Sequence, residues 1–338
     1  MTRVLRLGTR RSPLALAQSS QVARRIEQAG AGAVRVELVE VTTEGDVSNA
    51  PLTSFGGVGV FVSRLRAALA GGQVDLAVHS LKDLPTAGAP GLVLAAVPTR
   101  EDPRDALVAR DGLRLAELPA GSRIGTGSPR RAAQLRALGF GLDVVDLRGN
   151  VDTRIARVRG LGEPAAEGAG RADDLDAVVL ARAGLLRLGR DHLIGEVLDP
   201  LVMLPAPGQG ALAVECRDPG LGGAGDAEVL AALRPLDDAA TRSCVEAERA
   251  LLATLEAGCA APLGALAEIV EDEDGEQLWL RAVVASPDGA RSLRRSSLGR
   301  VGEAAGVGVA LAAELLAEGA GEFVGRQPLP VSPGEGQR

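Results

Sequence analysis

The first half of the chain alternates short apolar runs with stretches of helical periodicity, and this alternation limits the possible folds more than any other feature. The apolar runs cover residues 4–7, 34–41 and 74–78. Helix-like stretches separate them, one beginning at Pro13 and one near residues 61–70. Apolar strands that alternate with amphipathic helices are typical of a largely parallel sheet covered by helices. We therefore predict an α/β lobe at this end of the chain.

A second set of alternating segments begins near Asp105. Its predicted strands and helix starts follow one another along the chain, at residues 106–109, 122–125, 143–147 and 176–180 for the strands and at Pro129 and Val151 for the helices. The turn-rich residues 205–210 then predict a crossover, and residues 211–215 predict one more strand. We expect this strand to return the chain to the first lobe.

The pattern changes after Gly220, where a predicted helix at residues 239–255 precedes three strand-like runs. The runs are joined by hairpin turns and lie at residues 263–270, 277–285 and 292–297. A last helix is predicted at residues 304–318. This order of elements is typical of a separate α+β domain.

Together the patterns predict an α/β chain with two βα lobes and a C-terminal α+β domain. The first lobe is predicted to be discontinuous, at residues 1–102 and 205–220, and the second lobe to cover residues 103–204. The C-terminal domain would cover residues 221–325, and residues 326–338 would form a disordered tail. The aperiodic residues 160–174, rich in glycine, alanine and acidic residues, predict a mobile surface loop.

The composition argues against nucleic-acid-binding and membrane-spanning proteins. Aromatic residues make up 1% of the chain and its net charge is −7, so it lacks both the stacking side chains and the broad basic surface of nucleic-acid binders. No apolar run reaches the length of a membrane span, and the first residues lack a signal-peptide pattern, so we expect a cytoplasmic protein. Three cysteines and two histidines, without metal-ligand spacing, predict neither disulfides nor a metal site.

Arginines recur beside Gly, Ser or Thr at the ends of predicted strands. Ser12-Pro13 is typical of a helix N-cap and first helical residue, which places Arg10 and Arg11 on a strand-to-helix loop. The same placement recurs at Arg130, Arg131, Arg148 and Arg154. Backbone N–H groups and guanidinium groups bind carboxylates together, so the repetition predicts a site for a carboxylate-bearing ligand rather than a set of solvated surface arginines. The role of Arg187 stays open on pattern alone, and the sequence carries no phosphate-binding glycine motif.

Asp83 and Cys259 are the two candidate reactive side chains. Asp83 follows a predicted strand and Lys82, so its carboxylate either stabilises a cation formed in a reaction or is a helix N-terminal acid paired with Lys82. The spacing leaves both interpretations open. Cys259 lies in a Gly-Cys-Ala-Ala-Pro turn, where a thiol is accessible, whereas Cys216 and Cys244 fall in strand-like and helix-like segments and are expected to pack.

Six motifs in a fixed order resemble those of the porphobilinogen deaminase family, also called the hydroxymethylbilane synthases. The resemblance extends from about residue 4 to residue 324. The motifs are GTRRSPLAL at 8–16, TEGD at 43–46, VDLAVHSLKDLP at 74–85, REDPRDA at 100–106, the Arg130-Arg131 and Arg148-Gly149-Asn150 segments, and PGQGA at 207–211 before the Cys259 turn.

The resemblance implies two lobes like those of periplasmic binding proteins, a third domain, and an enzyme that joins four porphobilinogen molecules head to tail with release of ammonia. It implies a dipyrromethane cofactor bound to Cys259 through a thioether, and Asp83 as the carboxylate that stabilises the cation left when ammonia departs. The side chains implied to hold the carboxylates of cofactor and substrate are Arg10, Ser12, Ser80, Lys82, Thr126, Ser128, Arg130, Arg131, Arg148, Arg154, Arg187 and Gln209. Porphobilinogen and the growing polypyrrole would be the ligands of a monomeric protein.

The chain departs from the family pattern at two places. Ser54 and Val58 stand in a glycine loop where many relatives have lysines, and residues 160–174 form a longer stretch than usual. A non-enzymatic alternative is a two-lobed anion- or solute-binding protein, for which a signal peptide would be expected. Intact mass distinguishes the two classes, because only a deaminase would carry a two-pyrrole adduct.

Overall fold

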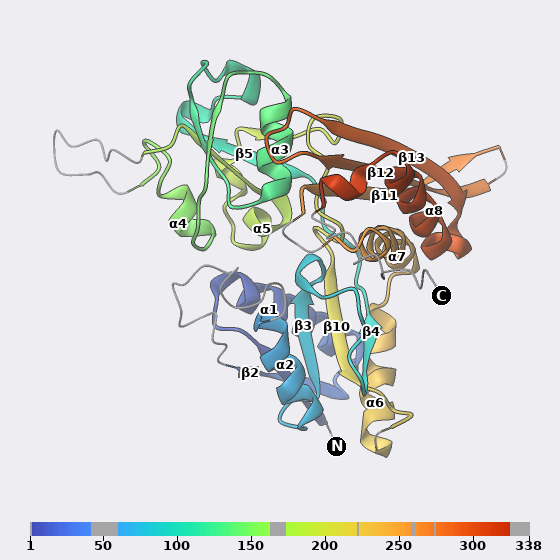
Figure 1. Cartoon of the computed structure of the whole chain (residues 1–338). Helices are drawn as coiled ribbons and strands as arrows, with labels where there is room; N and C mark the ends of the chain where they lie inside the picture. The colour runs from blue at the N-terminus through green and yellow to red at the C-terminus, as the bar shows by residue number, and fades with distance from the viewer. Residues whose placement is uncertain are drawn as a thin grey trace, which may run out of the picture.

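The computed structural model describes residues 2–41, 60–162, 174–221, 223–257, 261–273 and 275–324. Figure 1 shows two lobes and a C-terminal domain, with the chain coloured from blue through green to red. Ser54 and Val58, residues 163–173 of the predicted loop, Cys259 and the predicted tail at 326–338 lie outside the described residues. Within the described ranges, every helix is too short or too polar to span a bilayer.

Lobe 1 is a five-stranded sheet of order β2-β1-β3-β10-β4 with helices packed on it. Its strands are β1 (Arg3–Thr9), β2 (Val34–Glu40), β3 (Leu76–Ser80), β4 (Leu92–Ala96) and β10 (Leu212–Arg217), and its helices are α1 (Pro13–Ala29), α2 (Val60–Ala70) and α6 (Ala224–Leu233). Leu5, Leu7 and Leu76 share a buried cluster with Val22 and Ile26 of α1. Alternate strand residues face one side of a sheet and residues four apart face one side of a helix, so these side chains meet.

Lobe 2 repeats this plan with the strand order β7-β6-β8-β5-β9. Its strands are β5 (Asp105–Ala109), β6 (Arg123–Gly125), β7 (Asp143–Val145), β8 (Ala177–Ala181) and β9 (Glu196–Val197), and its helices are α3 (Pro129–Ala137), α4 (Val151–Ile155) and α5 (Arg182–Arg187). In lobe 1 the neighbouring strands β2, β1 and β3 are parallel, and in lobe 2 so are β7, β6 and β8. Next to β3 and to β8 lies a strand that enters from the other lobe, β10 and β5 respectively.

β5 and β10 are the strands that carry the chain between the lobes, and each runs antiparallel to its neighbours. Both sheets are therefore mixed, and the expectation of a largely parallel sheet is confirmed except for this one antiparallel strand in each lobe. Leu212, the first residue of β10, pairs with Ser80, the last residue of β3, and Asp105 pairs with Ala181 in the same way. Since each crossing strand begins at the carboxyl ends of the parallel strands, it must run back against them. Both crossovers thus lie at the sheet edges where α/β proteins bind ligands.

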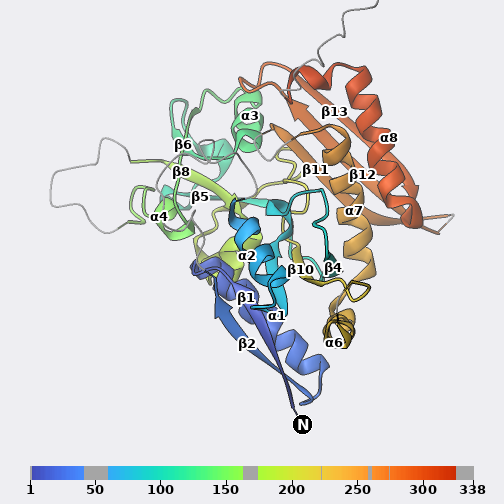
Figure 2. The same cartoon turned by 60° about the horizontal axis from the view of Figure 1, so that its bottom comes forward.

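The C-terminal domain is an antiparallel sheet with two helices on one face, as predicted. Its strands are β11 (Leu263–Asp272), β12 (Gly275–Ala285) and β13 (Ser292–Arg300), and its helices are α7 (Ala239–Thr254) and α8 (Ala304–Ala317). Leu251 of α7, Leu311 of α8 and Leu280 of β12 belong to one buried cluster. Figure 2 shows α7 and α8 side by side over the sheet, which agrees with their extensive contacts.

β4, β9 and α6 are elements that the sequence pattern did not indicate. Val229 and Leu233 of α6, together with Leu236, belong to the same buried cluster as Leu5 and Leu76 of lobe 1. We therefore propose that the C-terminal domain begins after Leu236 rather than at residue 221, because the preceding helix completes the core of lobe 1. The other predicted domain limits stay predictions.

Two glycines of α8 are expected to respond oppositely to alanine. A Cβ atom at Gly308 would clash with Ala247 O and lie 2.9 Å from Ala250 Cβ of α7, whereas one at Gly306 would meet nothing within 4 Å. Gly308→Ala should therefore destabilise the protein by roughly 1–3 kcal/mol. Gly306→Ala should stabilise it by about 0.5–1 kcal/mol, because alanine is the better helix former. Urea unfolding of both variants tests this, and equal effects would contradict the close packing of α7 and α8.

Candidate active site

One cavity of about 270 Å³ lies where both lobes and the C-terminal domain meet. Lys82 and Asp83 of lobe 1 form part of its wall, and Leu252, Ala261 and Leu263 of the C-terminal domain form another part. The remaining lining residues come from lobe 2 and the second crossover, and they are Gly127, Ser128, Pro129, Arg130, Arg131, Arg154, Ala206, Pro207 and Gln209. The structure therefore brings together Lys82, Asp83, Ser128, Arg130, Arg131, Arg154 and Gln209 of the predicted set.

The predicted strand-to-helix loops are confirmed at both lobes. Ser128 is the N-cap of α3, where its hydroxyl accepts a hydrogen bond from the Arg131 amide at 3.5 Å, and Pro129 is the first helical residue. Ser12 caps α1 in the same way by accepting from the Ala15 amide at 3.3 Å. The Ser128 amide also donates to Thr126 Oγ1 at 3.2 Å, which places buried Thr126 directly behind the loop. These local bonds turn the start of α3 toward the cavity.

Arg130 and Arg131 are held by one buried carboxylate that the sequence analysis did not single out, that of Asp105. Its Oδ2 accepts from Arg130 Nη1 at 2.8 Å, and its Oδ1 accepts from Arg131 Nη2 at 2.8 Å. Gln209 Nε2 donates to the same Oδ1 at 2.8 Å and to Pro103 O at 2.7 Å. Asp105 is fully buried, and the two arginines are 3% and 5% exposed. This arrangement links the starts of both crossing strands to α3.

The cavity carries more buried positive charge than Asp105 neutralises. Burial alone would raise the pKa of Asp105, but the guanidinium groups of Arg130 and Arg131 hold it well below its usual range. Burial lowers the pKa of Arg130 and of Lys82, and the neighbouring guanidinium groups act in the same direction. Burial and nearby Arg131 likewise lower the pKa of Arg154. Anionic groups of a ligand would offset this excess charge.

Two of these arginines have donors that the described protein does not use. Arg130 Nε is buried without a hydrogen-bond partner in the described part of the chain. Arg154 donates through Nε to Gly149 O at 2.8 Å, which leaves its two terminal nitrogens beside the cavity. By contrast, Arg131 also donates through Nη1 to Val179 O at 3.0 Å. A buried donor without an acceptor is costly, so Arg130 in particular is suited to an anionic ligand.

Asp83 is the last residue of a single 3₁₀ turn, Leu81–Asp83, that follows β3. The backbone closes the turn, because the Leu84 amide donates to Leu81 O at 3.0 Å. Since no longer helix starts here, Asp83 does not cap a helix N-terminus, which the alternative interpretation required. Its carboxylate is exposed at the cavity wall, and Lys82 is half-buried beside it.

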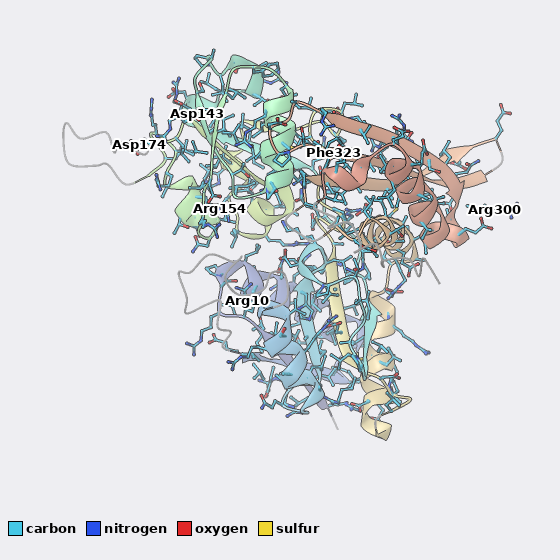
Figure 3. The ribbon with its side chains drawn as sticks, viewed as in Figure 1. Arg10, Asp143, Arg154, Asp174, Arg300 and Phe323 are labelled. Carbon is cyan, nitrogen blue, oxygen red and sulfur yellow. The ribbon has the colours of Figure 1, made fainter. Side chains whose placement is uncertain are left out.

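The other predicted binding residues lie outside the lining of this cavity. Ser80 accepts a hydrogen bond from Gln18 Nε2 at 2.9 Å, which ties α1 to the end of β3. Arg187 donates through Nη2 to Gly210 O at 2.7 Å at the second crossover. Arg148 is exposed, with Nε 3.3 Å from Asp146 Oδ2. Arg10 is on the loop before α1, and Figure 3 shows it and Arg154 on facing sides of lobes 1 and 2.

Cys259 is outside the described residues, but Ala261, two positions later in the sequence, lines the cavity. The two other cysteines pack in cores, as predicted. Burial raises the pKa of the Cys216 thiol and of the Cys244 thiol to about 11 in each case. Neither thiol forms an appreciable amount of the reactive thiolate at neutral pH.

Comparisons with known proteins agree with the six motifs. A family model described as "Porphobilinogen deaminase, dipyromethane cofactor binding domain" matches residues 5–220, and one described as "Porphobilinogen deaminase, C-terminal domain" matches residues 242–317. The porphobilinogen deaminase of Nocardia farcinica is 57% identical over 325 residues, covering 95% of this chain and 88% of that relative. That of Mycobacterium bovis is 54% identical over 326 residues, covering 95% and 98%.

Among solved structures, a periplasmic substrate-binding protein of an ABC transporter from Coxiella burnetii aligns with a TM-score of 0.39 at 16% identity, covering 68% of this chain and 91% of that chain. The two family models together cover most of the sequence, and the relatives match over nearly their whole length. This chain therefore belongs to the porphobilinogen deaminase family.

Proposed function

We propose that this porphobilinogen deaminase joins four porphobilinogen molecules head to tail in the cavity between its three parts, with Asp83 as the catalytic carboxylate. Ammonia is released at each step, and a linear hydroxymethylbilane is released at the end. One observation carries the proposal, namely that an exposed carboxylate, Asp83, shares a single cavity with the buried cations of Arg130 and Arg131. A carboxylate beside anion-binding groups suits a substrate that carries carboxylates and becomes cationic as it reacts.

The residues around the cavity fit the dipyrromethane cofactor for which the family model of residues 5–220 is described. Its acetate and propionate groups are carboxylates, and the cavity wall offers Lys82, Arg130 and Arg154 with Asp105 as the buried counter-ion. The unpaired Nε of Arg130 is a donor that such a carboxylate would satisfy. When bound, the dipyrromethane supplies the free pyrrole α-carbon to which the first substrate ring is joined. We propose Cys259 as its attachment point.

We assign carboxylate binding to the twelve side chains implied by the resemblance, with three kinds of role. Residues at the cavity wall would contact carboxylates directly, and they are Lys82, Ser128, Arg130, Arg131 and Arg154. Gln209, whose amide donates to Asp105 and to Pro103, would contribute by holding Asp105 in place. The others would bind rings that extend beyond this cavity, and they are Arg10, Ser12, Ser80, Thr126, Arg148 and Arg187. Each added pyrrole brings two more carboxylates, so a growing chain needs more guanidinium groups than a single ring does.

Asp83 would act on the charge that develops as ammonia leaves. The departing ammonia leaves a positive charge on the pyrrole of the substrate, and an ionised carboxylate stabilises that charge and accepts a hydrogen bond from the pyrrole N–H. The apolar wall of Leu252 and Leu263 excludes water from one side, which strengthens the interaction between the two charges.

We further propose that the protein works as a cytoplasmic monomer. The cavity is lined by residues from all three parts of this one chain, which supports a site formed within a monomer. Sedimentation at the concentration used for activity assays tests this, and activity confined to a dimer would contradict it.

Arg154→Ala is expected to impair binding more than it impairs folding. The change removes terminal guanidinium nitrogens that face the cavity, and a charge-assisted contact is worth about 1.5–3 kcal/mol, or roughly a ten- to hundredfold rise in KM. Arg190→Ala is the matched control. Arg190 pairs at 2.9 Å with Asp152, which lies on α4 together with Arg154, but Arg190 does not line the cavity. Steady-state kinetics on both variants measure the difference. An unchanged KM in Arg154→Ala, or an equal rise in both, would contradict the assignment.

A further inference from the structure

Arg249 connects the C-terminal domain to the turn that carries Asp83. It lies on α7, and its guanidinium donates through Nη1 to Leu84 O at 2.9 Å and through Nη2 to Pro85 O at 2.7 Å. These two carbonyls belong to the residues that directly follow Asp83. One half-buried side chain of the C-terminal domain therefore hydrogen-bonds to the backbone of lobe 1 immediately after the proposed catalytic residue.

The position of Asp83 depends on its backbone. Among the hydrogen bonds of the described residues none is to the Asp83 carboxylate, so the contacts of the turn's backbone largely determine where the carboxylate lies. The turn is anchored before Asp83 by the Leu81 amide, which donates to Ala211 O at 3.1 Å, and by buried Leu81, which clusters with Val245 of α7. After Asp83 the anchoring groups are the buried Leu84 side chain and the two bonds from Arg249. Loss of Arg249 would leave two carbonyls without their charged donor on this side.

The same face of α7 also reaches the cavity. Leu252 follows Arg249 by three positions, which places the two on neighbouring positions of one helix face, and Leu252 lines the cavity. α7 then ends at Thr254, five positions before Cys259. Arg249 thus links the turn of Asp83 to the helix that leads toward the proposed cofactor attachment.

We propose that Arg249 is a positioning residue that holds the Leu81–Asp83 turn against α7 and so sets where the Asp83 carboxylate meets the substrate. This inference rests on the proposed role of Asp83. It assigns Arg249 no contact with the substrate, and it predicts an effect on turnover rather than on substrate binding. A displacement of a reacting group by about 1 Å can cost up to roughly a hundredfold in rate.

Arg242 provides a matched control on the same helix. It also reaches from α7 to lobe 1, where its Nη2 lies 3.3 Å from Leu94 O and 2.7 Å from Asp237 Oδ1. Both arginines therefore tie α7 to lobe 1 through a backbone carbonyl. Leu94 belongs to β4, which does not line the cavity. Arg242→Ala removes a comparable link without touching the Asp83 turn.

The first measurement is amide hydrogen exchange in the cofactor-loaded protein, which reports the turn without relying on activity. In Arg249→Ala the Leu84 amide, which donates to Leu81 O, should exchange at least about tenfold faster, whereas the amides of β3 should keep the wild-type rate. In Arg242→Ala the Leu84 amide should be unchanged. Wild-type exchange at Leu84 in Arg249→Ala would overturn the proposal. In Arg249→Lys, which keeps one charged donor, the Leu84 amide should exchange at a rate between those in Arg249→Ala and in the wild type. This variant replaces Arg249→Ala if the latter does not fold.

The second measurement is a double-variant cycle in turnover. Arg249→Ala should lower kcat by roughly ten- to a hundredfold with KM within about twofold of wild type, and guanidinium ion at non-denaturing concentration should restore part of the rate. If Arg249 acts through Asp83, adding Arg249→Ala to Asp83→Asn should cost little more. A full additive loss in the double variant, or a rise in KM alone, would overturn the positioning role. Near-normal turnover of Asp83→Asn by itself would instead refute the proposed function, so the two failures are distinguishable.

Discussion

Replacing Cys259 with alanine is expected to give a folded protein that carries no two-pyrrole adduct and has no measurable turnover. A thioether needs a sulfur nucleophile at the cavity, and Ala261, two positions along the chain from Cys259, lines that cavity. The remaining cysteines cannot substitute, because burial raises the pKa of the Cys216 and Cys244 thiols to about 11. Intact-mass measurement of the purified variant, together with product formation from porphobilinogen, tests the expectation.

Cys216→Ala and Cys244→Ala are the controls for this result. Each removes a buried thiol from a packed core, so each should lower the thermal midpoint while keeping the adduct and the activity. A normal adduct mass on Cys259→Ala would refute Cys259 as the attachment point. Loss of the adduct in either control, with the fold intact, would show that the attachment chemistry involves another thiol.

Asp83→Asn is expected to lower turnover by at least about a hundredfold, or roughly 2.7 kcal/mol of transition-state stabilisation, while the adduct on Cys259 is retained. The amide keeps the size and shape of the side chain but removes the negative charge that would stabilise the cation formed when ammonia leaves. Because the positive charge on the substrate develops only during the reaction, substrate binding should change little. Asp83 is exposed and caps no helix, so the thermal midpoint should stay close to that of the wild-type protein.

The matched control is Asp143→Asn, which removes an exposed carboxylate on β7, away from the cavity lining. Turnover and thermal midpoint measured on the same preparations separate a catalytic role from a structural one. A lowered midpoint with near-normal turnover in Asp83→Asn would refute the catalytic role. A similar loss of turnover in Asp143→Asn would show that the loss follows from the change in net charge and not from the removal of a carboxylate at the cavity.

The local architecture of the binding loops was predictable because its signals are short-range. Ser12 and Ser128 each cap a helix through an amide three positions later, with proline as the first helical residue, and both contacts lie within one turn of chain. Asp83 was likewise recognised as a candidate from its place after a strand, whereas the binding role of Lys82 came from the family resemblance. Residues that act through such nearby backbone groups can be recognised without knowledge of the fold.

The partners of the arginines were not predictable in the same way. Asp105 binds Arg131 from 26 positions away, and its only sequence signal is its place in the REDPRDA motif. Gln18 meets Ser80 across 62 positions, and nothing in its helical surroundings distinguishes it from an ordinary polar residue. The contact of Asp105 forms because its crossing strand begins at the carboxyl edge of the sheet, a direction that hydrophobic periodicity does not specify. The contact of Gln18 forms because α1 packs beside the end of β3.

The sequence by itself determined the two βα lobes, the α+β domain and the helix caps, because periodicity and capping depend on neighbours within a few positions. Together with the family resemblance it also indicated half of the residues at the cavity wall. Only the tertiary structure decided which arginines are neutralised, which retain donors for a ligand, and how the Asp83 turn is held. Arg249 meets Leu84 across 165 positions. Such a contact depends on how the C-terminal domain packs against lobe 1, and its free energy is realised only once that packing exists.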